Sequence, residues 1–276
     1  MSKNNIYINC SELASFIGQN KWDYLTPFIR LWKRVDKNDY MLCENNSDLK
    51  IIDKKEELNN TLGEEYITKI INSKKNIREN VQESCNHIEN LDLDNNKKEE
   101  LKNNIENLIN TNFGTTNEYG ALEIYELKNN VKLNKTQVYT SVKCHETDKN
   151  IWFVGGKVDG LLDTSKIVEV KTRTRCFFKD VRDYENTQMQ MYMHIYNIDK
   201  TDLVEYLPNN KIKIKITGIK KDEKYIKSLL EKITIFTKNF EDFISSPLEN
   251  KVAFYAMNDS DKKEFLSKLY INKMYL

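Results

Sequence analysis

Apolar and polar positions follow two different periods along this chain. Short apolar runs between polar turns predict β-strands, at residues 138–142, 151–154, 161–162, 167–168, 203–207 and 212–216. Residues 222–245 instead have apolar side chains at helical spacing and predict a long amphipathic helix. Its expected core face consists of Tyr225, Leu229, Ile233, Phe236 and Phe240.

Residues 44–110 differ in composition from the rest of the chain. They are rich in Asn, Lys and Glu, their apolar residues recur at helical spacing, and Tyr66 is their one aromatic residue. We expect two or three amphipathic helices here, inserted between N-terminal helices in residues 1–43 and an α/β part in residues 111–276. The expected fold class is therefore α/β, a mixed β-sheet flanked by helices, with an inserted helical segment.

The strands around residues 161–162 and 167–168 carry two carboxylates. The turn 163–165 joins the two strands, so a paired hairpin places Asp159 opposite Glu169. Glu169 and Lys171 are two residues apart and therefore share one face of their strand. The sequence thus predicts that two carboxylates and an amine lie together at one end of this hairpin.

Two carboxylates this close stay ionised when a cation lies between them, and a hard divalent ion such as Mg²⁺ prefers oxygen ligands. A lysine beside that ion can hold a nucleophilic water or balance charge on a phosphate. Ordinary cross-strand charge pairs would give the same residue pattern. The flanking Gly155, Gly156 and Gly160, together with strands that are apolar on both faces, favour a buried site.

Two predicted helices flank this hairpin in the sequence. Gly114 and the threonines after it predict a helix start that carries Glu118 on its first turns. Residues 184–196 predict a second helix, in which Gln188, Tyr192 and Ile195 share a face.

The order of these motifs is more specific than any one of them: Gly-x-x-x-Glu, Asp, Glu-x-Lys and a Gln-x-x-x-Tyr helix. It resembles the PD-(D/E)XK nuclease superfamily, and within it the lambda-exonuclease branch of YqaJ-type viral recombinases. The resemblance covers residues 8–34 and 113–196, including a helix from Pro27 to Arg34. The chain departs from it at Val158, where the superfamily's name has proline, and at Lys157, where the branch commonly has a small residue.

The resemblance implies a set of catalytic residues and a metal centre. The catalytic residues would be Glu118, Asp159, Glu169, Lys171 and Gln188. Two ions, Mg²⁺ or Mn²⁺, would be held by Glu118, Asp159, Glu169 and the backbone carbonyl of Val170. Glu65 is an alternative to Glu118, because Gly63 precedes it, but the residues after Glu118 continue the family pattern.

The formal net charge is +1, so any surface that binds DNA must be local. Residues 166–182 are basic, with Phe177 and Phe178 interleaved, as in grooves that follow a phosphate backbone, although both rings could equally belong to the core. The residues expected to bind DNA are Ser11, Lys157, Arg173, Arg175 and Tyr192. Ser11 would offer its hydroxyl to a 5′-phosphate, or would only cap the first helix.

Five scattered cysteines with no Cys-x-x-Cys pair indicate reduced thiols in an intracellular protein of the cytoplasm, the nucleus or a viral replication site. No apolar stretch approaches transmembrane length, and residues 1–4 do not form a signal peptide.

The expected function is a Mg²⁺-dependent deoxyribonuclease. From the resemblance it is a 5′→3′ exonuclease on double-stranded DNA in viral or phage-type recombination, repair or genome processing, with a single-strand annealing protein and oligomer formation as further implications. An endonuclease or DNA/RNA nuclease of the same superfamily, and a catalytically silent DNA-binding protein, are the alternatives.

Overall fold

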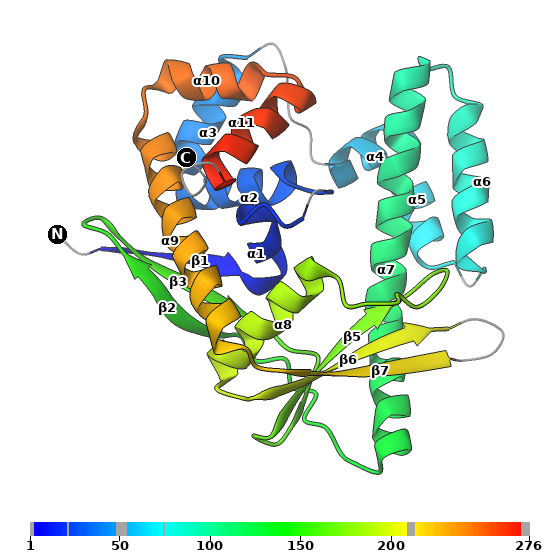
Figure 1. Cartoon of the computed structure of the whole chain (residues 1–276). Coiled ribbons are helices and arrows are strands. Elements are labelled where there is room, and N and C mark those ends of the chain that lie inside the picture. The colour runs from blue at the N-terminus through cyan, green and yellow to red at the C-terminus, as the bar shows by residue number, and fades with distance from the viewer. Residues whose placement is uncertain (1–2, 21, 48–53, 74, 209–212, 272–276) are drawn as a thin grey trace.

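The computed structural model describes residues 3–20, 22–47, 54–73, 75–208 and 213–271. Helices cover two β-sheets, so the expected α/β class is confirmed (Figure 1). In chain order the elements are β1 (Asn4–Asn9), α1 (Cys10–Phe16), α2 (Leu25–Val35), α3 (Lys37–Asn45), α4 (Lys54–Leu62), α5 (Glu64–Ile71), α6 (Ile77–Glu89), α7 (Asn95–Asn129), β2 (Thr140–Glu146), β3 (Asn150–Gly156), β4 (Gly160–Leu162), β5 (Lys166–Thr172), α8 (Asp183–Tyr196), β6 (Lys200–Leu207), β7 (Lys213–Lys220), α9 (Glu223–Ser245), α10 (Leu248–Ala256) and α11 (Asp259–Ile271).

The strands form two sheets where the sequence suggested one. The first has the order β1-β3-β2 and the second β4-β5-β6-β7. In the first, β1 runs parallel to β3; in the second, β5 runs parallel to β6, and the other pairs are antiparallel. The chain passes from one sheet to the other at residues 157–159, between β3 and β4. Asp159 therefore lies where the two sheets separate.

Sequence reasoning missed strand β1, as well as helices α10 and α11. Strand β1 alternates exposed polar residues with buried Ile6 and Ile8, which is the period-2 pattern of a half-buried strand. It pairs with β3 from Asn4 opposite Asn150 to Asn9 opposite Gly155. Helix α1 begins at the next residue, Cys10, and therefore starts at this end of the first sheet. The strand is short and flanked by asparagines, so its alternation is easily overlooked.

Helix α9 is confirmed almost residue for residue. Asp222 caps it by accepting hydrogen bonds from the backbone of Lys224 and Tyr225. The expected core side chains from Leu229 to Phe240 are fully buried, and Tyr225 packs partly buried at the edge of the same core. This core also contains residues of α1, α2, α8 and β3. One hydrophobic core therefore joins α9 to the first sheet and to the N-terminal helices.

Helix α7 corrects the expected helix start near residue 113. It runs without a break for 35 residues, and Gly114 lies in its interior. An interior glycine costs about 1 kcal/mol relative to alanine. Packing at both ends outweighs this cost: Leu101 and Ile105 are buried in the core of the inserted helices, and Leu122 and Tyr125 against β5 and β6.

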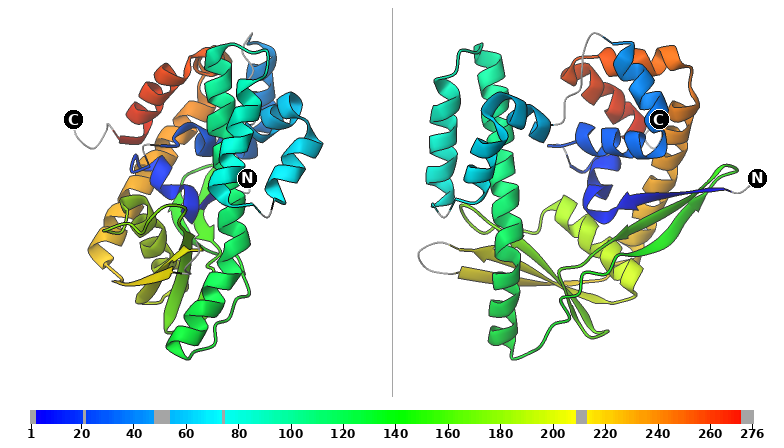
Figure 2. Two further views of the ribbon diagram at one scale, coloured as in Figure 1. Left: turned by 90° about the vertical axis from the view of Figure 1, so that its right-hand side faces the viewer. Right: turned by 180° about the vertical axis from the view of Figure 1, so that it is seen from behind.

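The inserted helices have a hydrophobic core of their own, formed by residues of α4, α5, α6 and α7. Figure 2 shows α6 and α7 side by side at one flank of the molecule, opposite the flank of α9 to α11. The boundary expected at residues 110 and 111 falls inside α7, so the insertion and the β-sheets share one continuous helix.

No helix in the described ranges is both long enough and apolar enough to cross a membrane. All five cysteines lie in the described ranges, and none of them forms a disulfide.

Candidate active site

The β4–β5 hairpin forms as the sequence predicts. Gly160 pairs with Val168 and Leu162 with Lys166, and the turn at residues 163–165 contains Asp163 with a φ of 47°. This register continues to place Asp159 opposite Glu169. A carboxylate oxygen of Asp159 accepts a hydrogen bond from the backbone N–H of Val170, at 2.7 Å. The hairpin therefore fixes Asp159 directly beside the Glu-x-Lys segment.

Glu169 is buried, with 3% of its surface exposed. Its Oε1 accepts hydrogen bonds from Lys171 Nζ at 2.9 Å and from Gln188 Nε2 at 3.0 Å. Its Oε2 is buried and has no hydrogen-bond partner among the described residues. A buried carboxylate oxygen without a partner is costly, because water no longer solvates it. A cation beside this atom would remove that cost.

The two carboxylates share an environment that disfavours their charge. Burial raises the pKa of Asp159 to about 7, against the opposing charge of Lys171, and nearby Glu118 contributes to the rise. Burial likewise raises the pKa of Glu169 to about 7, again opposed by Lys171 and increased by Asp159. Burial lowers the pKa of Lys171, but the charges of Glu169, Asp159 and Glu185 and the hydrogen bond to Glu169 together leave that pKa raised, so the amine stays protonated. One ammonium does not neutralise the pair.

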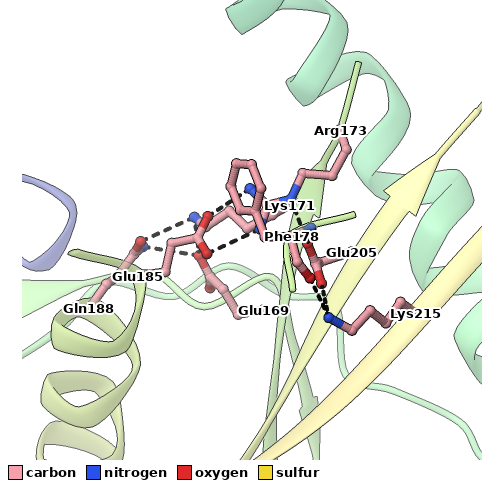
Figure 3. Close-up of polar contacts among 8 residues, drawn as sticks. All are labelled: Glu169, Lys171, Arg173, Phe178, Glu185, Gln188, Glu205 and Lys215. Atoms are coloured by element: carbon pink, nitrogen blue, oxygen red, sulfur yellow. Dashed lines mark hydrogen bonds and ion pairs between the residues drawn. The ribbon is translucent and has the colours of Figure 1, made fainter. Parts of the chain in front are cut away.

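Helix α8 supplies the side chains that hold this arrangement (Figure 3). The Gln188 amide donates to Glu169, and its carbonyl oxygen accepts from Lys171 at 3.1 Å. Its Nε2 also donates to the hydroxyl of Tyr192, one turn later, at 3.1 Å. A Cβ on Gly156 would lie 2.7 Å from the Tyr192 ring, so the glycine is what lets this ring pack against β3. The predicted shared face of Gln188 and Tyr192 is confirmed.

Glu118 enters the site from α7. It is partly buried, and Gln137 donates a hydrogen bond to its Oε1 at 2.7 Å. Its proximity to Asp159 appears in the raised pKa of that carboxyl. Glu65, the alternative residue, is exposed on the first turn of α5 in the inserted helices.

The donor set fits a hard divalent ion. The carboxylates of Asp159 and Glu169 lie opposite each other at the end of a hairpin, burial raises the pKa of both, and one oxygen lacks a partner, so a divalent ion with oxygen ligands would suit them. No three His, Cys, Asp or Glu side chains in the described ranges form a metal site by themselves. Asp159 and Glu169 would therefore need a further ligand, such as the Val170 carbonyl, a water or a moved Glu118.

Arg173 has a different environment from the one expected of a DNA-binding residue. It is 9% exposed, and its guanidinium donates to both carboxylate oxygens of Glu185, at 2.7 and 3.0 Å. Its Nε donates to Glu205 Oε1 at 2.9 Å. Lys215 pairs with the other oxygen of Glu205 at 3.2 Å. These bonds leave Arg173 in a buried ionic network, and the structure does not support a role for it in DNA contact (Figure 3).

Sequence reasoning missed Glu185 and Glu205 in this network. Glu205 lies in β6, where almost every side chain is buried. The strand carries two buried carboxylates, Asp202 and Glu205, and a carboxylate in such a strand signals a buried partner, because an unpaired charge is too costly there. The identity of the partner could not be read, since 32 residues separate Glu205 from Arg173.

The other expected DNA contacts differ in accessibility. The Arg175 side chain is 76% exposed, and its nearest acidic atom is Glu106 Oε1 at 4.0 Å. Ser11 and Lys157 are exposed, whereas Tyr192 is 3% exposed and supports Gln188 instead of facing solvent. Ser11 is also not the helix cap, because Asn9 occupies that position.

The loop after β5 holds one of its aromatic residues in place. The guanidinium groups of Arg173 and Arg182 both stack on the Phe178 ring, at 4.1 and 4.2 Å from its centre. The backbone N–H of Phe178 donates to Glu205, and its carbonyl accepts from Lys215. Phe178 therefore anchors the loop to the second sheet.

No family model and no curated protein matches the sequence. Among solved structures, the chain is similar to the alkaline exonuclease of Laribacter hongkongensis, with 15% identity over 72% of this chain and 93% of that one, at a TM-score of 0.36. The dAMP complex of LHK-Exo gives 16% identity over 68% and 91%, at a TM-score of 0.40. A phage-related exonuclease of Haemophilus somnus gives 14% identity over 81% and 88%, at 0.37. Similarities of this size do not bear on what the chain binds or cleaves.

Proposed function

We propose that this chain is a divalent-metal-dependent deoxyribonuclease. The observation that carries the proposal is the pairing of Asp159 and Glu169 at the end of one hairpin, with both carboxyl pKa values raised to about 7 and one buried oxygen left without a partner. Burying two such groups together is unfavourable unless a cation compensates them. Functional sites commonly contain perturbed groups of this kind.

The residues have separable roles in phosphodiester hydrolysis. A bound Mg²⁺ or Mn²⁺ would polarise the phosphate and lower the pKa of a water. Asp159 and Glu169 would hold the metal, and Glu118 would serve a second ion. The protonated Lys171 would stabilise charge on the phosphate or orient the attacking water. Gln188 holds the side chains of Lys171 and Glu169 in place, since it forms hydrogen bonds with both.

The substrate and direction of cleavage rest on the resemblance to the lambda-exonuclease branch. From this resemblance we infer a 5′→3′ exonuclease on double-stranded DNA, acting in recombination, repair or genome processing together with an annealing protein. An endonuclease or a DNA/RNA nuclease would use the same metal and lysine chemistry.

A catalytically silent DNA-binding protein is disfavoured by Lys171. Its ammonium is tied to Glu169 and to Gln188 inside the site, a position that suits charge stabilisation better than contact with a DNA surface.

The test is a digestion of end-labelled linear DNA beside covalently closed circular DNA, in Mg²⁺ and in EDTA. An exonuclease degrades the linear DNA in Mg²⁺ alone and spares the closed circle. Asp159→Ala and Glu169→Ala should lower cleavage by roughly 10³-fold while leaving DNA binding in place. Cleavage of the circle would identify an endonuclease. Binding without cleavage under all conditions would overturn the nuclease proposal.

A further inference from the structure

A cavity of about 410 Å³ lies between α2, α4 and α7, outside the site described above. Its charged lining residues are all basic: Arg30 and Lys33 from α2, and Lys54 and Lys55 from α4. Among the described residues that line it there is no aspartate or glutamate. Asn107 and Thr111 of α7 contribute polar groups to the opposite wall. Leu25, Ile29, Leu58 and Leu108 also line the cavity, so it is a recess with an apolar surface and four basic residues, between the N-terminal helices and the inserted helices.

The charges around this recess are accessible. All four basic residues are exposed; Arg30 lies 3.7 Å from Glu12, and the Lys33 ammonium lies 4.5 Å from the ring centre of Tyr40. Of the two glutamates of α4, Glu57 is buried and is bound by Lys97 and Asn104, and Glu56 is exposed but does not line the recess. Like charges gathered around one hollow repel each other, and a polyanion bound there would relieve that repulsion. The recess is thus complementary to a phosphate backbone.

Helix α7 connects the recess to the candidate active site. Thr111 and Glu118 are seven residues apart, and Asn104, which also lines the recess, is seven residues before Thr111. Residues seven apart fall on nearly the same face of a helix, because two turns take about 7.2 residues. At about 1.5 Å per residue, Thr111 lies about 10 Å from Glu118 along the axis and Asn104 about 21 Å. Double-stranded DNA rises about 3.4 Å per base pair, so these distances span about three to six base pairs.

We propose that this recess binds phosphates of the DNA duplex whose end lies at Asp159 and Glu169. The inserted helices would then serve to extend the DNA-binding surface, with Lys33 and Lys54 holding the backbone several base pairs from the cleaved bond. This inference rests on the proposed function, and it gives the insertion a role in affinity rather than in chemistry. Figure 1 shows α4 between α2 and α7.

The test measures binding of a fluorescent duplex of about 20 base pairs at several salt concentrations, in EDTA so that no DNA is cut. Each phosphate contact contributes about 0.9 to the slope of log affinity against log salt. Lys33→Gln/Lys54→Gln should therefore reduce the slope by about two and weaken binding by about tenfold at moderate salt. Lys33→Arg/Lys54→Arg, which keeps both charges, should retain the wild-type slope.

The matched control is Lys227→Gln/Lys238→Gln, which removes two exposed lysines of α9 outside the recess. It should keep the wild-type slope. An unchanged slope in Lys33→Gln/Lys54→Gln, or an equal loss in the control, would overturn the assignment of the recess. Cleavage by the wild type is scored separately. A wild type that never cleaves DNA, yet loses its slope on substitution of Lys33 and Lys54, would remove the proposed nuclease and leave the recess as a nucleic-acid site.

Discussion

Arg173 donates two parallel hydrogen bonds to the carboxylate of Glu185, at 2.7 and 3.0 Å. The pair joins the end of β5 to α8: Arg173 directly follows β5, two residues after Lys171, and Glu185 lies in α8, three residues before Gln188. Both residues are almost fully buried. The pair therefore fixes the spacing between the strand that carries the lysine and the helix that carries the glutamine.

Arg173→Met should destabilise the fold strongly. It leaves the Glu185 carboxylate buried without its partner, and breaking a buried ion pair from one side typically costs about 3–5 kcal/mol. Denaturant unfolding measures the change. Arg175→Gln is the control, because that side chain is 76% exposed and should change stability by less than about 0.5 kcal/mol. A loss below about 1 kcal/mol for Arg173→Met would show that the network contributes little.

The metal-free protein should lose stability as pH rises. Asp159 and Glu169 have pKa values of about 7 in the folded chain, whereas unfolded carboxyls titrate near about 4. The folded state therefore binds more protons between these values, and its stability falls from about pH 4 to about pH 7 and then levels off. Thermal melting in EDTA should show this fall in the wild type and a smaller one in Asp159→Asn/Glu169→Gln.

Mg²⁺ should counteract that loss. Because the ion competes with protons for the same oxygens, it should raise the melting temperature of the wild type more at pH 8 than at pH 6. The doubly substituted protein should respond at neither pH. An equal response of both proteins would place the metal elsewhere.

Glu118→Gln should weaken occupancy of a second metal and lower cleavage in Mg²⁺. Raised Mn²⁺ should restore part of the activity, since Mn²⁺ tolerates poorer oxygen sites. Glu65→Gln is the matched comparison, because Glu65 also follows a glycine but is exposed on α5. Inactivation by Glu65→Gln with a silent Glu118→Gln would reverse the choice between the two glutamates.

Lys171→Ala should lower turnover about a hundredfold, as the loss of one positioned donor to a developing charge does. Its effect on metal affinity should be small, because the lysine is not a ligand. Single-turnover cleavage together with a Mg²⁺ titration separates these two quantities. A large shift in the Mg²⁺ midpoint at unchanged turnover would show that Lys171 only organises Glu169.

Recognition of a 5′-phosphate should depend on Lys157. Strands β1 and β3 are parallel, with Asn9 opposite Gly155, so Ser11 and Lys157 each follow the same end of the paired strands by two residues. The wild type should cleave 5′-phosphorylated duplex ends about tenfold faster than 5′-hydroxyl ends, and Lys157→Ala should abolish the difference. Equal rates on both ends in the wild type would contradict this role and favour an enzyme that enters DNA internally.

The sequence by itself determined the local parts of the site. A short turn between apolar strands fixes the hairpin, so the opposition of Asp159 and Glu169 follows from spacing alone. The same holds for the side chains of Gln188 and Tyr192, which lie one helical turn apart. These relationships span few residues, and the geometry of one strand pair or one helix decides them.

Tertiary structure decided what depends on distant partners. Packing at both ends of α7 carries the helix through Gly114, although the local sequence indicates a helix start there. Likewise, the sequence of the basic segment after β5 does not indicate whether Arg173 or Arg175 is buried. Glu205 of β6 and Glu185 of α8 withdraw Arg173 from solvent, while Arg175 stays exposed. Burial of a charge depends on the partners that the fold brings to it, and the order of residues along one segment does not contain them.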